Sequence, residues 1–600
     1  MKIKLSQFIA DYLVDYGIRH NFTVTGGGAM HLNDAFGHKE GMECIYNHHE
    51  QACAIAAEAY ARLTGNIALV CVTSGPGGTN AITGVLGGWL DSVPMLVISG
   101  QVKRETTLWS TDVPLRQLGD QEFNIVDVAK EMTKYAVMVT EPKEIKYHLE
   151  KALYLAKNGR PGPVWLDIPL DVQATVIDTD ELKGYEPSDD TIENPIYDEG
   201  LTRDIISKIE EAKRPVILAG TGIRIAGAYE EFLKCVDKLG IPVVTAWNAH
   251  DLLEYDNPLF VGKPGTVGTR GGNFVVQNCD LLLVLGCRMN IRMISYNKHQ
   301  FAKNAYKIVV DIDENELKKP TVNVDMPIHA NVKDVMNSLA MFDGNIKHNE
   351  SHMKWLKWCK DIDAKYPAAK KEYFNINSPL NPYAFLDKAF DAFKSDEVII
   401  CGNGSACVMT FQTAKIKSGQ RLFTNSGCAA MGYGFPAAIG ACIARDNKRT
   451  VCIDGDGSFQ MNLQELQTVV YNRLDMKIVY LNNNGYHSIR QTQTNLFDPP
   501  MVGVCDGTGI SFPNMERIAY AYDIPYVRID NLDDCDVKLN EALNRTGPVI
   551  IEAIVDPKQN FEPKLSSKVH PDGTITSPEL DDMFPFLPEE EYRSNKQLDF

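Results

Sequence analysis

The stretch from 450 to 488, TVCIDGDGSFQMNLQELQTVVYNRLDMKIVYLNNNGYHS, carries the strongest chemical signal in this sequence. It predicts a strand, a Gly-Asp-Gly turn, a helix, a second strand and an Asn-Asn pair. Asp456 and Asn483 follow the two strands, and a right-handed β-α-β unit places both turns at the carboxyl ends of neighbouring parallel strands. One carboxylate and one amide oxygen suit a small hard cation that keeps phosphate oxygens as its other ligands. Gly455 and Gly457 allow the backbone to come close to such a group.

Two further segments contain residue types that could do chemistry. NHHEQACAIAAEAYARLTG, residues 47–65, places Glu50 at the start of an alanine-rich helical pattern. Taken alone, a glutamate there indicates only a favourable charge at the helix dipole. SGCAAMGYGFPAAIG, residues 426–440, contains Met431 in an apolar run, where methionine usually indicates core packing. Each segment by itself leaves structure and function open.

Together the three segments resemble thiamine-diphosphate-dependent enzymes, and the acetolactate synthase family in particular. The resemblance covers about residues 1–560 in order, and includes TVTGGGAMHLNDAF, TSGPGGTN, DSVPMLVISGQ, DQEFNIVDVAKEMTKYA and RPGPVWLDIP. It implies that Asp456 and Asn483 ligate Mg²⁺ by their side chains and Gly485 by its carbonyl oxygen. It also implies that a protonated Glu50 donates to the pyrimidine ring of thiamine diphosphate and so promotes ylid formation.

The same resemblance implies the other site residues. Met431 would wedge between the two rings of the cofactor, and Gln121 would act as a catalytic residue near the substrate entrance. Ser405 and Ala406 stand where acetolactate synthases often have Gln and His, so contacts to the diphosphate are expected to depend more on backbone amides. The cofactor-binding residues that the aligned motifs imply are Gly27, Gly28, Glu50, Asn403, Gly404, Ser405, Met431, Gly455, Asp456, Gly457, Ser458, Asn483, Gly485 and Tyr486.

The middle of the chain resembles the flavin-binding segments of acetolactate synthase. Arg288 and Asp311 match flavin contacts, although the usual FDDR reads MNIR here. FAD is therefore an expected cofactor with a structural role, because the reaction needs no net redox step. The matching segments are GTGIRIAGA (220–228), GTVGTRGG (265–272), GCRMNIR (286–292) and DID (311–313).

Alternating β-branched runs and helical patterns predict the fold that must position these residues. We expect an α/β chain with three doubly wound parallel-sheet domains, because 600 residues exceed one ordinary core. The pyrimidine-binding domain is expected at 1–175, a central flavin-binding-like domain at 196–342, and the diphosphate- and Mg²⁺-binding domain at 376–560, with a tail at 561–600. The resemblance implies a homodimer or homotetramer whose sites lie at subunit interfaces.

Composition limits the classes of function. The formal net charge of −18 argues against a nucleic-acid surface or an anionic-membrane surface. No apolar run reaches the roughly 18 residues that a membrane span needs. The N-terminal pattern MKIKLSQFIADYLVDYG is amphipathic rather than that of a signal peptide, and the fourteen cysteines include no CxxC pair. We therefore expect a cytoplasmic enzyme that acts on a small-molecule 2-keto acid.

The reaction class follows from two further stretches. GQVKRETTLWSTDVPLRQLGDQE contains no histidine, which counts against simple decarboxylation, because decarboxylases in this family relay protons through a histidine pair there. Where biosynthetic synthases read NNxxxGMVxQWQ, this chain reads NNNGYHSIRQTQ. Thr492 replaces the tryptophan, with His487, Ser488 and Arg490 nearby, which predicts a larger and more polar acceptor pocket.

Three functions remain open on the sequence. The leading one is an acetolactate-synthase-type carboligase that decarboxylates pyruvate and transfers the two-carbon unit to a second pyruvate. The alternative is transfer to a nucleotide-activated keto-deoxysugar in branched-sugar biosynthesis. A flavin-dependent pyruvate oxidase is less favoured. The acceptor decides between the first two, and the redox behaviour of the flavin separates the third.

Overall fold

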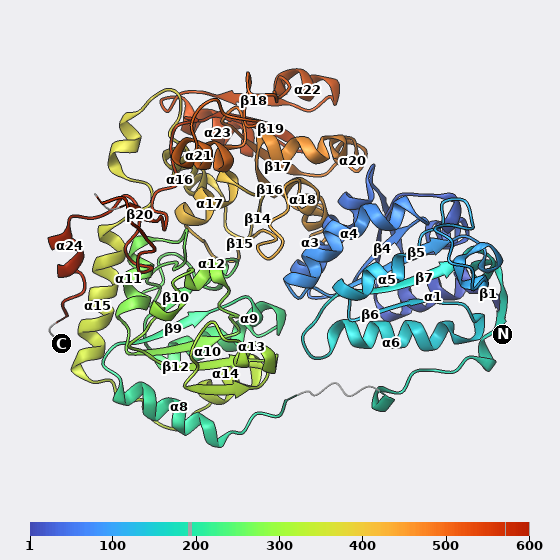
Figure 1. The fold of residues 1–600 in the computed structure, drawn as a ribbon, viewed down its shortest axis with the longest axis horizontal. Helices are drawn as coiled ribbons and strands as arrows, with labels where there is room; N and C mark the ends of the chain where they lie inside the picture. The colour runs from blue at the N-terminus through green and yellow to red at the C-terminus, as the bar shows by residue number, and fades with distance from the viewer. Residues whose placement is uncertain (190–194, 570–571, 599–600) are drawn as a thin grey trace.

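A computed structural model of the chain describes residues 1–189, 195–569 and 572–598. The chain forms three α/β bodies, each built on an all-parallel sheet (Figure 1). The first body lies at the right of the view, the central body at the lower left and the third body at the top. This architecture confirms the predicted fold class. No helix among the described residues has both the length and the apolar composition needed to cross a bilayer.

The first body has a six-stranded sheet in the order β3-β2-β4-β5-β7-β6. Its strands are β2 (His20–Thr23), β3 (Glu43–Tyr46), β4 (Ala68–Val72), β5 (Met95–Gln101), β6 (Tyr135–Met138) and β7 (Val164–Pro169). Its helices are α1 (Leu5–Tyr16), α2 (Met30–His38), α3 (Glu50–Thr64), α4 (Pro76–Leu90), α5 (Ile125–Ala129), α6 (Ile145–Lys157) and α7 (Leu170–Ala174). A short antiparallel pair, β1 (Lys2–Lys4) with β8 (Val176–Asp178), lies beside it.

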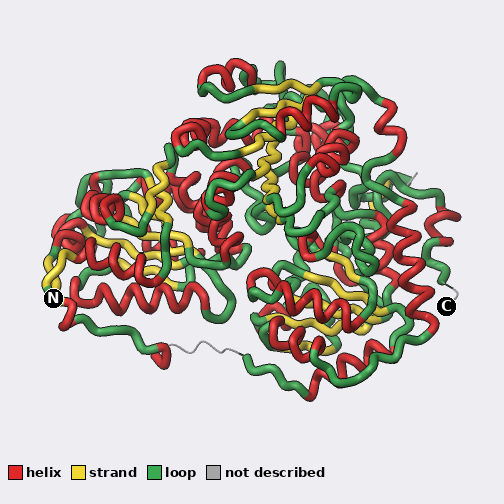
Figure 2. Tube along the Cα trace, turned by 180° about the vertical axis from the view of Figure 1, so that it is seen from behind, coloured by secondary structure: helices red, strands yellow, loops and turns green. Residues whose placement is uncertain are grey.

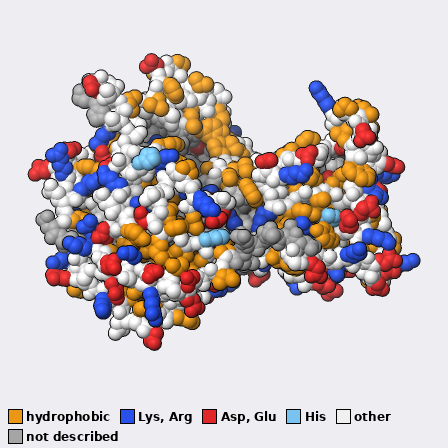
Figure 3. All heavy atoms as spheres, turned by 60° about the horizontal axis from the view of Figure 1, so that its bottom comes forward, with side chains coloured by type: hydrophobic (Ala, Val, Ile, Leu, Met, Phe, Trp, Pro, Cys, Tyr) orange, Lys and Arg blue, Asp and Glu red, His pale blue; other side chains and the backbone are white. Residues whose placement is uncertain are grey.

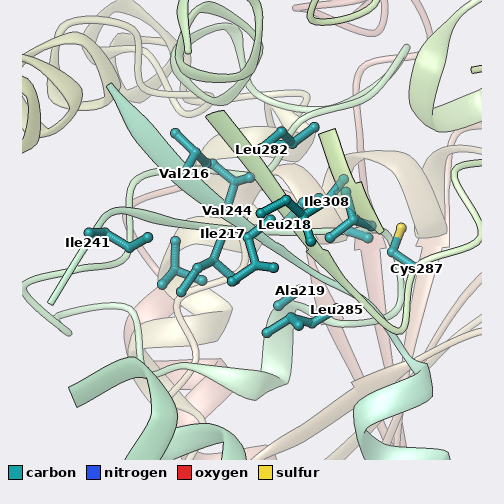
Figure 4. Close-up of a cluster of buried hydrophobic side chains, with 14 of the residues drawn as sticks. Val216, Ile217, Leu218, Ala219, Ile241, Val244, Leu282, Leu285, Cys287 and Ile308 are labelled. Carbon is teal, nitrogen blue, oxygen red and sulfur yellow. The ribbon is translucent and has the colours of Figure 1, made fainter. Parts of the chain in front are cut away.

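The central body has a five-stranded sheet in the order β10-β9-β11-β12-β13. Its strands are β9 (Pro215–Ala219), β10 (Val243–Thr245), β11 (Leu281–Leu285), β12 (Tyr306–Asp311) and β13 (Met326–His329). Its helices are α8 (Gly200–Glu211), α9 (Gly222–Ile225), α10 (Tyr229–Leu239), α11 (Arg270–Asn278), α12 (Ile291–Ile294), α13 (Glu314–Lys318) and α14 (Val332–Ala340). Leucine, isoleucine and valine side chains of β9, β10 and β11 interlock in its core (Figure 4).

The third body has a six-stranded sheet in the order β15-β14-β16-β17-β19-β18. Its strands are β14 (Val398–Cys401), β15 (Arg421–Phe423), β16 (Thr450–Gly455), β17 (Met476–Asn482), β18 (Tyr526–Ile529) and β19 (Val549–Ile554). Its helices are α16 (Pro382–Ala392), α17 (Ser405–Thr413), α18 (Gly434–Ile443), α19 (Asp456–Phe459), α20 (Leu466–Tyr471), α21 (His487–Leu496), α22 (Met515–Ala521) and α23 (Cys535–Leu543).

The C-terminal tail returns to the central body. It contains β20 (Lys568–Val569), β21 (Ile575–Thr576) and α24 (Glu589–Ser594), and lies near α15 (Glu350–Lys365) (Figure 2). The guanidinium of Arg270 on α11 donates to the carbonyl oxygens of Met583 and Pro585, at 3.2 and 2.6 Å. These bonds satisfy tail carbonyls that the short elements leave without a ladder partner.

The first and third bodies meet through α3 and α18. Gly440 on α18 is required for this contact, because a Cβ there would lie 1.9 Å from the carbonyl oxygen of Ala56 on α3. The alanine-rich sequence of α3 has the same cause, since small side chains let the two helices approach closely. Tyr433, just before α18, donates its hydroxyl to the buried Glu58 of α3 at 2.7 Å. The N-terminus of α3, which carries Glu50, is thereby fixed against the third body.

Candidate active site

Asp456 and Asn483 come together as the sequence predicts. β16 and β17 are parallel neighbours, and the two residues directly follow them. Asp456 is 2% exposed; its Oδ1 accepts the N–H of Gly457 at 2.8 Å, and its Oδ2 accepts the N–H of Gly485 at 2.9 Å. Burial raises the pKa of Asp456 to about 6, against the effect of these two bonds. The two turns therefore form one site at the edge of the sheet.

The side-chain oxygen of Asn483 has no partner among the described residues, although it is buried. The amide nitrogen of Asn483 donates to the hydroxyl of Ser405 at 3.1 Å, so the side chain is oriented from its other end. A buried hydrogen-bond acceptor that has no donor destabilises a folded protein. Beside the Asp456 carboxylate, this oxygen fits one ligand position of a hard cation such as Mg²⁺. The residues present therefore fit the predicted metal.

Glycines shape the turns around this site. Gly404 has φ 68° and directly precedes α17, whose first residue is Ser405. A Cβ at Gly457 would lie 2.1 Å from the ring of Tyr486, so only glycine fits there. A Cβ at Gly455 would meet nothing within 4 Å, so that position faces open space. No side chain of the described residues caps the start of α17, so its first N–H groups, together with the open space over Gly455, suit an anionic group.

The loop that carries Met431 is held on both sides. Asn403 donates to the carbonyl oxygen of Ala430 at 2.5 Å. On the other side, the N–H of Gly432 donates to the Ser458 hydroxyl at 2.9 Å. Met431 itself is half-buried between these anchors. Asn403 and Ser458, both predicted to contact the cofactor, thus also fix the predicted wedge residue.

Glu50 is the first residue of α3 and is half-buried. Its carboxylate accepts a hydrogen bond from the side chain of Asn80 on α4 at 2.9 Å. Among the described residues no hydrogen bond or ion pair joins Glu50 to Asp456, Asn483 or Gly485. The helix dipole and the Asn80 amide both favour a carboxyl group at this position.

The remaining predicted residues of the first body lie beyond the carboxyl ends of its strands. Gly27 and Gly28 form a short 3₁₀ turn after β2, and a Cβ on Gly27 would meet nothing within 4 Å. The N–H of Gly28 donates to the Thr73 hydroxyl at 3.0 Å. Gln121 is exposed, with φ 58°, and its carbonyl oxygen lies against Gly75, where a Cβ would approach it to 2.4 Å. The turn at Gly28, the segment 73–75 and Gln121 are therefore neighbours at this end of the sheet.

Arg288 and Asp311, the predicted flavin contacts, line one cavity of about 310 Å³. The cavity lies where the three bodies meet, since Arg62 and Asp91 of the first body and Ser426 of the third also line it. Burial raises the pKa of Asp311 to about 6. Asp311 thus places a carboxyl group in the cavity at the end of β12, and Arg288 places a guanidinium there in the turn after β11.

Two glycine turns form part of this cavity wall. Gly222 follows β9 and Gly286 follows β11, and a Cβ on Gly222 would lie 2.8 Å from the Cα of Gly286. Trp247 lines the wall beyond them and stacks on Phe411 of α17, with ring centroids 4.7 Å apart. Glycine turns at the carboxyl ends of adjacent parallel strands are where dinucleotides bind in such sheets.

The residues around the predicted acceptor pocket differ in what they can contact. Thr492 is exposed on α21, and its hydroxyl donates to the carbonyl oxygen of Ser488 within the helix. His487 is 5% exposed, and burial lowers its pKa to about 4, so it is neutral at pH 7. The Arg490 guanidinium donates to three backbone carbonyls instead of facing an open pocket.

Sequence reasoning missed two buried polar residues that follow the GDGSF motif. Asn462 donates both to the carbonyl oxygen of Gly432 at 2.7 Å and to the Gln51 side chain at 3.2 Å. Glu465 is fully buried and accepts from the Asn47 side chain at 2.9 Å and from the N–H of His48 at 3.0 Å. They connect the Met431 loop and the metal-site helix to the residues that flank Glu50.

Comparisons with known proteins agree with this geometry. The model of the N-terminal TPP binding domain of thiamine pyrophosphate enzymes matches residues 3–128. The model of their central domain matches residues 202–339, and that of their C-terminal TPP binding domain matches residues 402–553. The three matches follow chain order, and each contains most of the strands of one of the three sheets.

Full-length relatives narrow the family. The acetolactate synthase large subunit of Lactococcus lactis subsp. lactis (strain IL1403) is 31% identical over 590 residues, which cover 96% of this chain and 97% of the relative. That of Cyanidium caldarium is 32% identical over 94% and 95% of the two chains. Isozyme 1 of Escherichia coli (strain K12) is 31% identical over 93% and 95%. The chain therefore belongs to the thiamine pyrophosphate enzymes and is a carboligase of the acetolactate synthase large-subunit type.

Proposed function

We propose that this enzyme makes acetolactate from two molecules of pyruvate, with thiamine diphosphate and Mg²⁺ bound at the third body. The unpartnered side-chain oxygen of Asn483 beside the Asp456 carboxylate carries the proposal. A buried unpartnered amide oxygen and a carboxylate at the ends of neighbouring strands are ligand types that a hard cation such as Mg²⁺ takes. The acetolactate synthase names of the full-length relatives supply the substrate class.

Residues of the third body, 376–560, would hold the metal and the diphosphate. Asp456 and Asn483 supply side-chain oxygens, and Gly485 a carbonyl oxygen, to Mg²⁺. The N–H groups at the start of α17, from Ser405 onward, would bind diphosphate oxygens. When bound, thiamine diphosphate supplies an electron sink for the decarboxylation of a 2-keto acid. Met431, held by the two anchors of its loop, would keep the two rings of the cofactor in contact.

Residues of the first body, 1–175, would act on the pyrimidine ring and the substrate. Glu50 donates a hydrogen bond to a ring nitrogen when its carboxyl group is protonated. Asn80 orients that carboxyl group through the 2.9 Å bond. Gly27 leaves room for the reacting centre because nothing lies within 4 Å of its added Cβ. Gln121, exposed beside Gly75, would contact the bound keto acid.

A second copy of the chain would complete each site. In the part of the chain that the structure describes, no hydrogen bond or ion pair joins Glu50 to Asp456, Asn483 or Gly485, and apolar side chains are exposed in the segments 104–123 and 486–504. They include Trp109 at 60% and Phe497 at 66% exposure. Figure 3 shows hydrophobic side chains gathered along the hollow between the larger and the smaller part of the molecule. We infer a homodimer, or a homotetramer built from it, that covers these faces.

FAD would occupy the three-body cavity of the central domain, 196–342. The glycine turns at Gly222 and Gly286 allow close approach of a dinucleotide backbone. Asp311 can accept from a sugar-alcohol hydroxyl, and Arg288 can pair with a phosphate or flavin oxygen.

All fourteen cysteines are free, which suits a reducing compartment such as the cytoplasm.

The test incubates purified protein with thiamine diphosphate, Mg²⁺, FAD and pyruvate, and follows carbon products by NMR. Prompt acetolactate formation that stops on chelation of Mg²⁺ is the expected result. The flavin should stay oxidised; bleaching on addition of pyruvate would instead indicate an oxidase. Carbon dioxide release without acetolactate would contradict pyruvate as acceptor and direct the assay to keto sugars. Absence of turnover would contradict pyruvate as donor.

A further inference from the structure

Arg490 makes an unusual set of contacts on α21. Its Nη1 donates to the carbonyl oxygen of Asn483 at 3.1 Å and to that of Pro557 at 3.3 Å. Its Nη2 donates to the carbonyl oxygen of Asn484 at 2.6 Å. One guanidinium thus connects the turn after β17 with the segment after β19. Three charge-assisted bonds from a rigid planar group fix backbone orientation better than one lysine could.

Gly485 provides the space that this guanidinium occupies. A Cβ on Gly485 would lie 2.6 Å from Nη2 of Arg490 and 2.1 Å from the carbonyl oxygen of Val504. Gly485 also has φ 148°, a conformation that other residues rarely adopt. The synthase pattern NNxxxGMVxQWQ leaves both of these positions open and places its glycine where this chain has His487. Gly485 and Arg490 are therefore a structurally matched pair in this chain.

The contacts determine how the turn presents its ligands. The guanidinium holds the backbone carbonyls of Asn483 and Asn484, and Ser405 accepts from the side-chain nitrogen of Asn483, while the side-chain oxygen of Asn483 has no partner among the described residues. The N–H of Gly485 then reaches the Asp456 carboxylate at 2.9 Å. We propose that Arg490 is the positioning residue of the Mg²⁺ site: it fixes the turn 483–485 in its ligating form and so sets the affinity for the metal. This inference rests on the proposed function of the same site.

The position of Arg490 in the sequence suggests that it binds the acceptor substrate. Its contacts in the structure do not fit that role. An arginine that binds a substrate carboxylate or phosphate keeps its paired donors free for two parallel bonds. Here both terminal nitrogens already donate to backbone carbonyls. Residues that hydrogen-bond to metal ligands, without touching the metal, hold those ligands in place. Mutation of such a residue lowers metal affinity about 10- to 100-fold, and Arg490 has the contacts of such a residue.

The experiment measures Mg²⁺-dependent binding of thiamine diphosphate by calorimetry, without substrate. Arg490→Met removes the guanidinium with all three bonds and keeps only an unbranched apolar stem, and Arg490→Lys keeps the charge but not the planar fork. Arg517→Met, an exposed arginine on α22, is the matched control. We expect the half-saturating Mg²⁺ concentration to rise about tenfold in Arg490→Met and less in Arg490→Lys, with Arg517→Met unchanged.

Each contrary outcome has a distinct meaning. Unchanged Mg²⁺ dependence in both variants overturns the inference. A raised KM for pyruvate with unchanged Mg²⁺ dependence also overturns it, and assigns Arg490 to substrate binding. If Arg490→Met does not fold, Arg490→Lys carries the test, since it keeps the cation in place. Failure of the wild-type protein to bind thiamine diphosphate in a Mg²⁺-dependent way contradicts the proposed function itself.

Discussion

The first and third bodies share one topology and differ in chemistry. Their sheets run β3-β2-β4-β5-β7-β6 and β15-β14-β16-β17-β19-β18, which is the same order when strands are counted within each body. Even the helices correspond: α3 follows β3 and α18 follows β15, and these two helices pack against each other. The molecule is therefore built around a contact between equivalent parts of two similar halves.

The difference lies in the side chains at corresponding strand ends. In the third body β16 and β17 lead to Asp456 and Asn483, an acid and an amide. In the first body the equivalent β4 leads to Thr73 and Gly75, and Thr73 accepts from the N–H of Gly28. Parallel sheets supply the position at their carboxyl ends, and the residues placed there decide whether it can hold a cation. Both acids start a helix, but Asp456 starts α19 directly after the central strand β16, whereas Glu50 starts α3 after the edge strand β3.

This contrast predicts that substitutions in the two bodies affect cofactor binding and turnover differently, with the larger effect in the third body. Asp456→Asn removes the carboxylate that neutralises the metal, so both cofactor binding and turnover should be lost, by more than about a thousandfold in turnover. Calorimetry with thiamine diphosphate and Mg²⁺ checks the binding. Asp536→Asn, on the surface of the same body, is the control. Retained Mg²⁺-dependent binding in Asp456→Asn would contradict the metal assignment.

Glu50→Gln should separate binding from chemistry. The amide keeps the size of the carboxyl group and its place at the start of α3, and its N–H can still donate a hydrogen bond, but it has no acidic proton to share with the ring nitrogen, so turnover should fall about 100- to 1,000-fold. Binding of thiamine diphosphate should stay within about threefold of wild type, because the diphosphate and metal are held by the other half. If thiamine diphosphate binding fell as much as turnover, Glu50 would be needed for cofactor binding as well as for the chemical step, which contradicts the separation of the two roles.

The long buried strands of the third body were the part of the fold most readily predicted. The apolar run MKIVYLN at 476–482 predicts a strand and coincides with β17, and the run TVCID at 450–454 predicts a strand one residue shorter than β16. Continuous runs of buried β-branched residues carry this signal. β3, by contrast, is only four residues long and mostly not buried, so neither its length nor its burial pattern marks it. The helical pattern of 79–90 predicts a helix that starts at Thr79, but α4 begins at Pro76, because proline at the first position suits a helix start.

The candidate site could be predicted in its parts but not in its connections. The pairing of Asp456 with Asn483 follows from local β-α-β geometry. The roles of Asn462 and Glu465 depend on contacts with Gln51 and Asn47, more than 400 positions away, which no local pattern encodes. Arg490 was expected beside the acceptor because only its neighbours in the sequence were visible. Its bond to the Pro557 carbonyl depends on the adjacency of β17 and β19.

A buried acid in the first body predicts a pH effect on stability. Asp167 on β7 is 1% exposed, and burial raises its pKa to about 7, although Ser99 and Gln101 donate to it. Because the folded pKa lies above the ordinary value, its stabilising contribution is complete below about pH 4 and is lost as pH rises through 7. Between pH 5 and 8 this loss is on the order of 2 kcal/mol.

Asp167→Asn should therefore flatten the fall in Tm between pH 5 and 8, measured by thermal unfolding across that range. Asp112→Asn, an exposed carboxylate of the same body, is expected to keep the wild-type slope. Equal slopes in Asp167→Asn and wild type would show that Asp167 is ionised in the folded protein throughout this range.

The smallest effect tests the contact between the equivalent helices. In Gly440→Ala the new Cβ would lie 1.9 Å from the Ala56 carbonyl oxygen, so α3 and α18 must separate, at a cost of about 1–2 kcal/mol and a few degrees in Tm. Gly87→Ala on α4 is the matched control: its nearest neighbour, the Asn425 amide of the third body, lies 3.7 Å away, so it should be neutral or slightly stabilising. Because Glu50 starts α3, Gly440→Ala should also lower turnover while Mg²⁺ dependence stays unchanged. Equal Tm values for Gly440→Ala and Gly87→Ala would mean that contacts other than α3 with α18 hold the first and third bodies together. The contact between these equivalent helices would then not determine the position of Glu50.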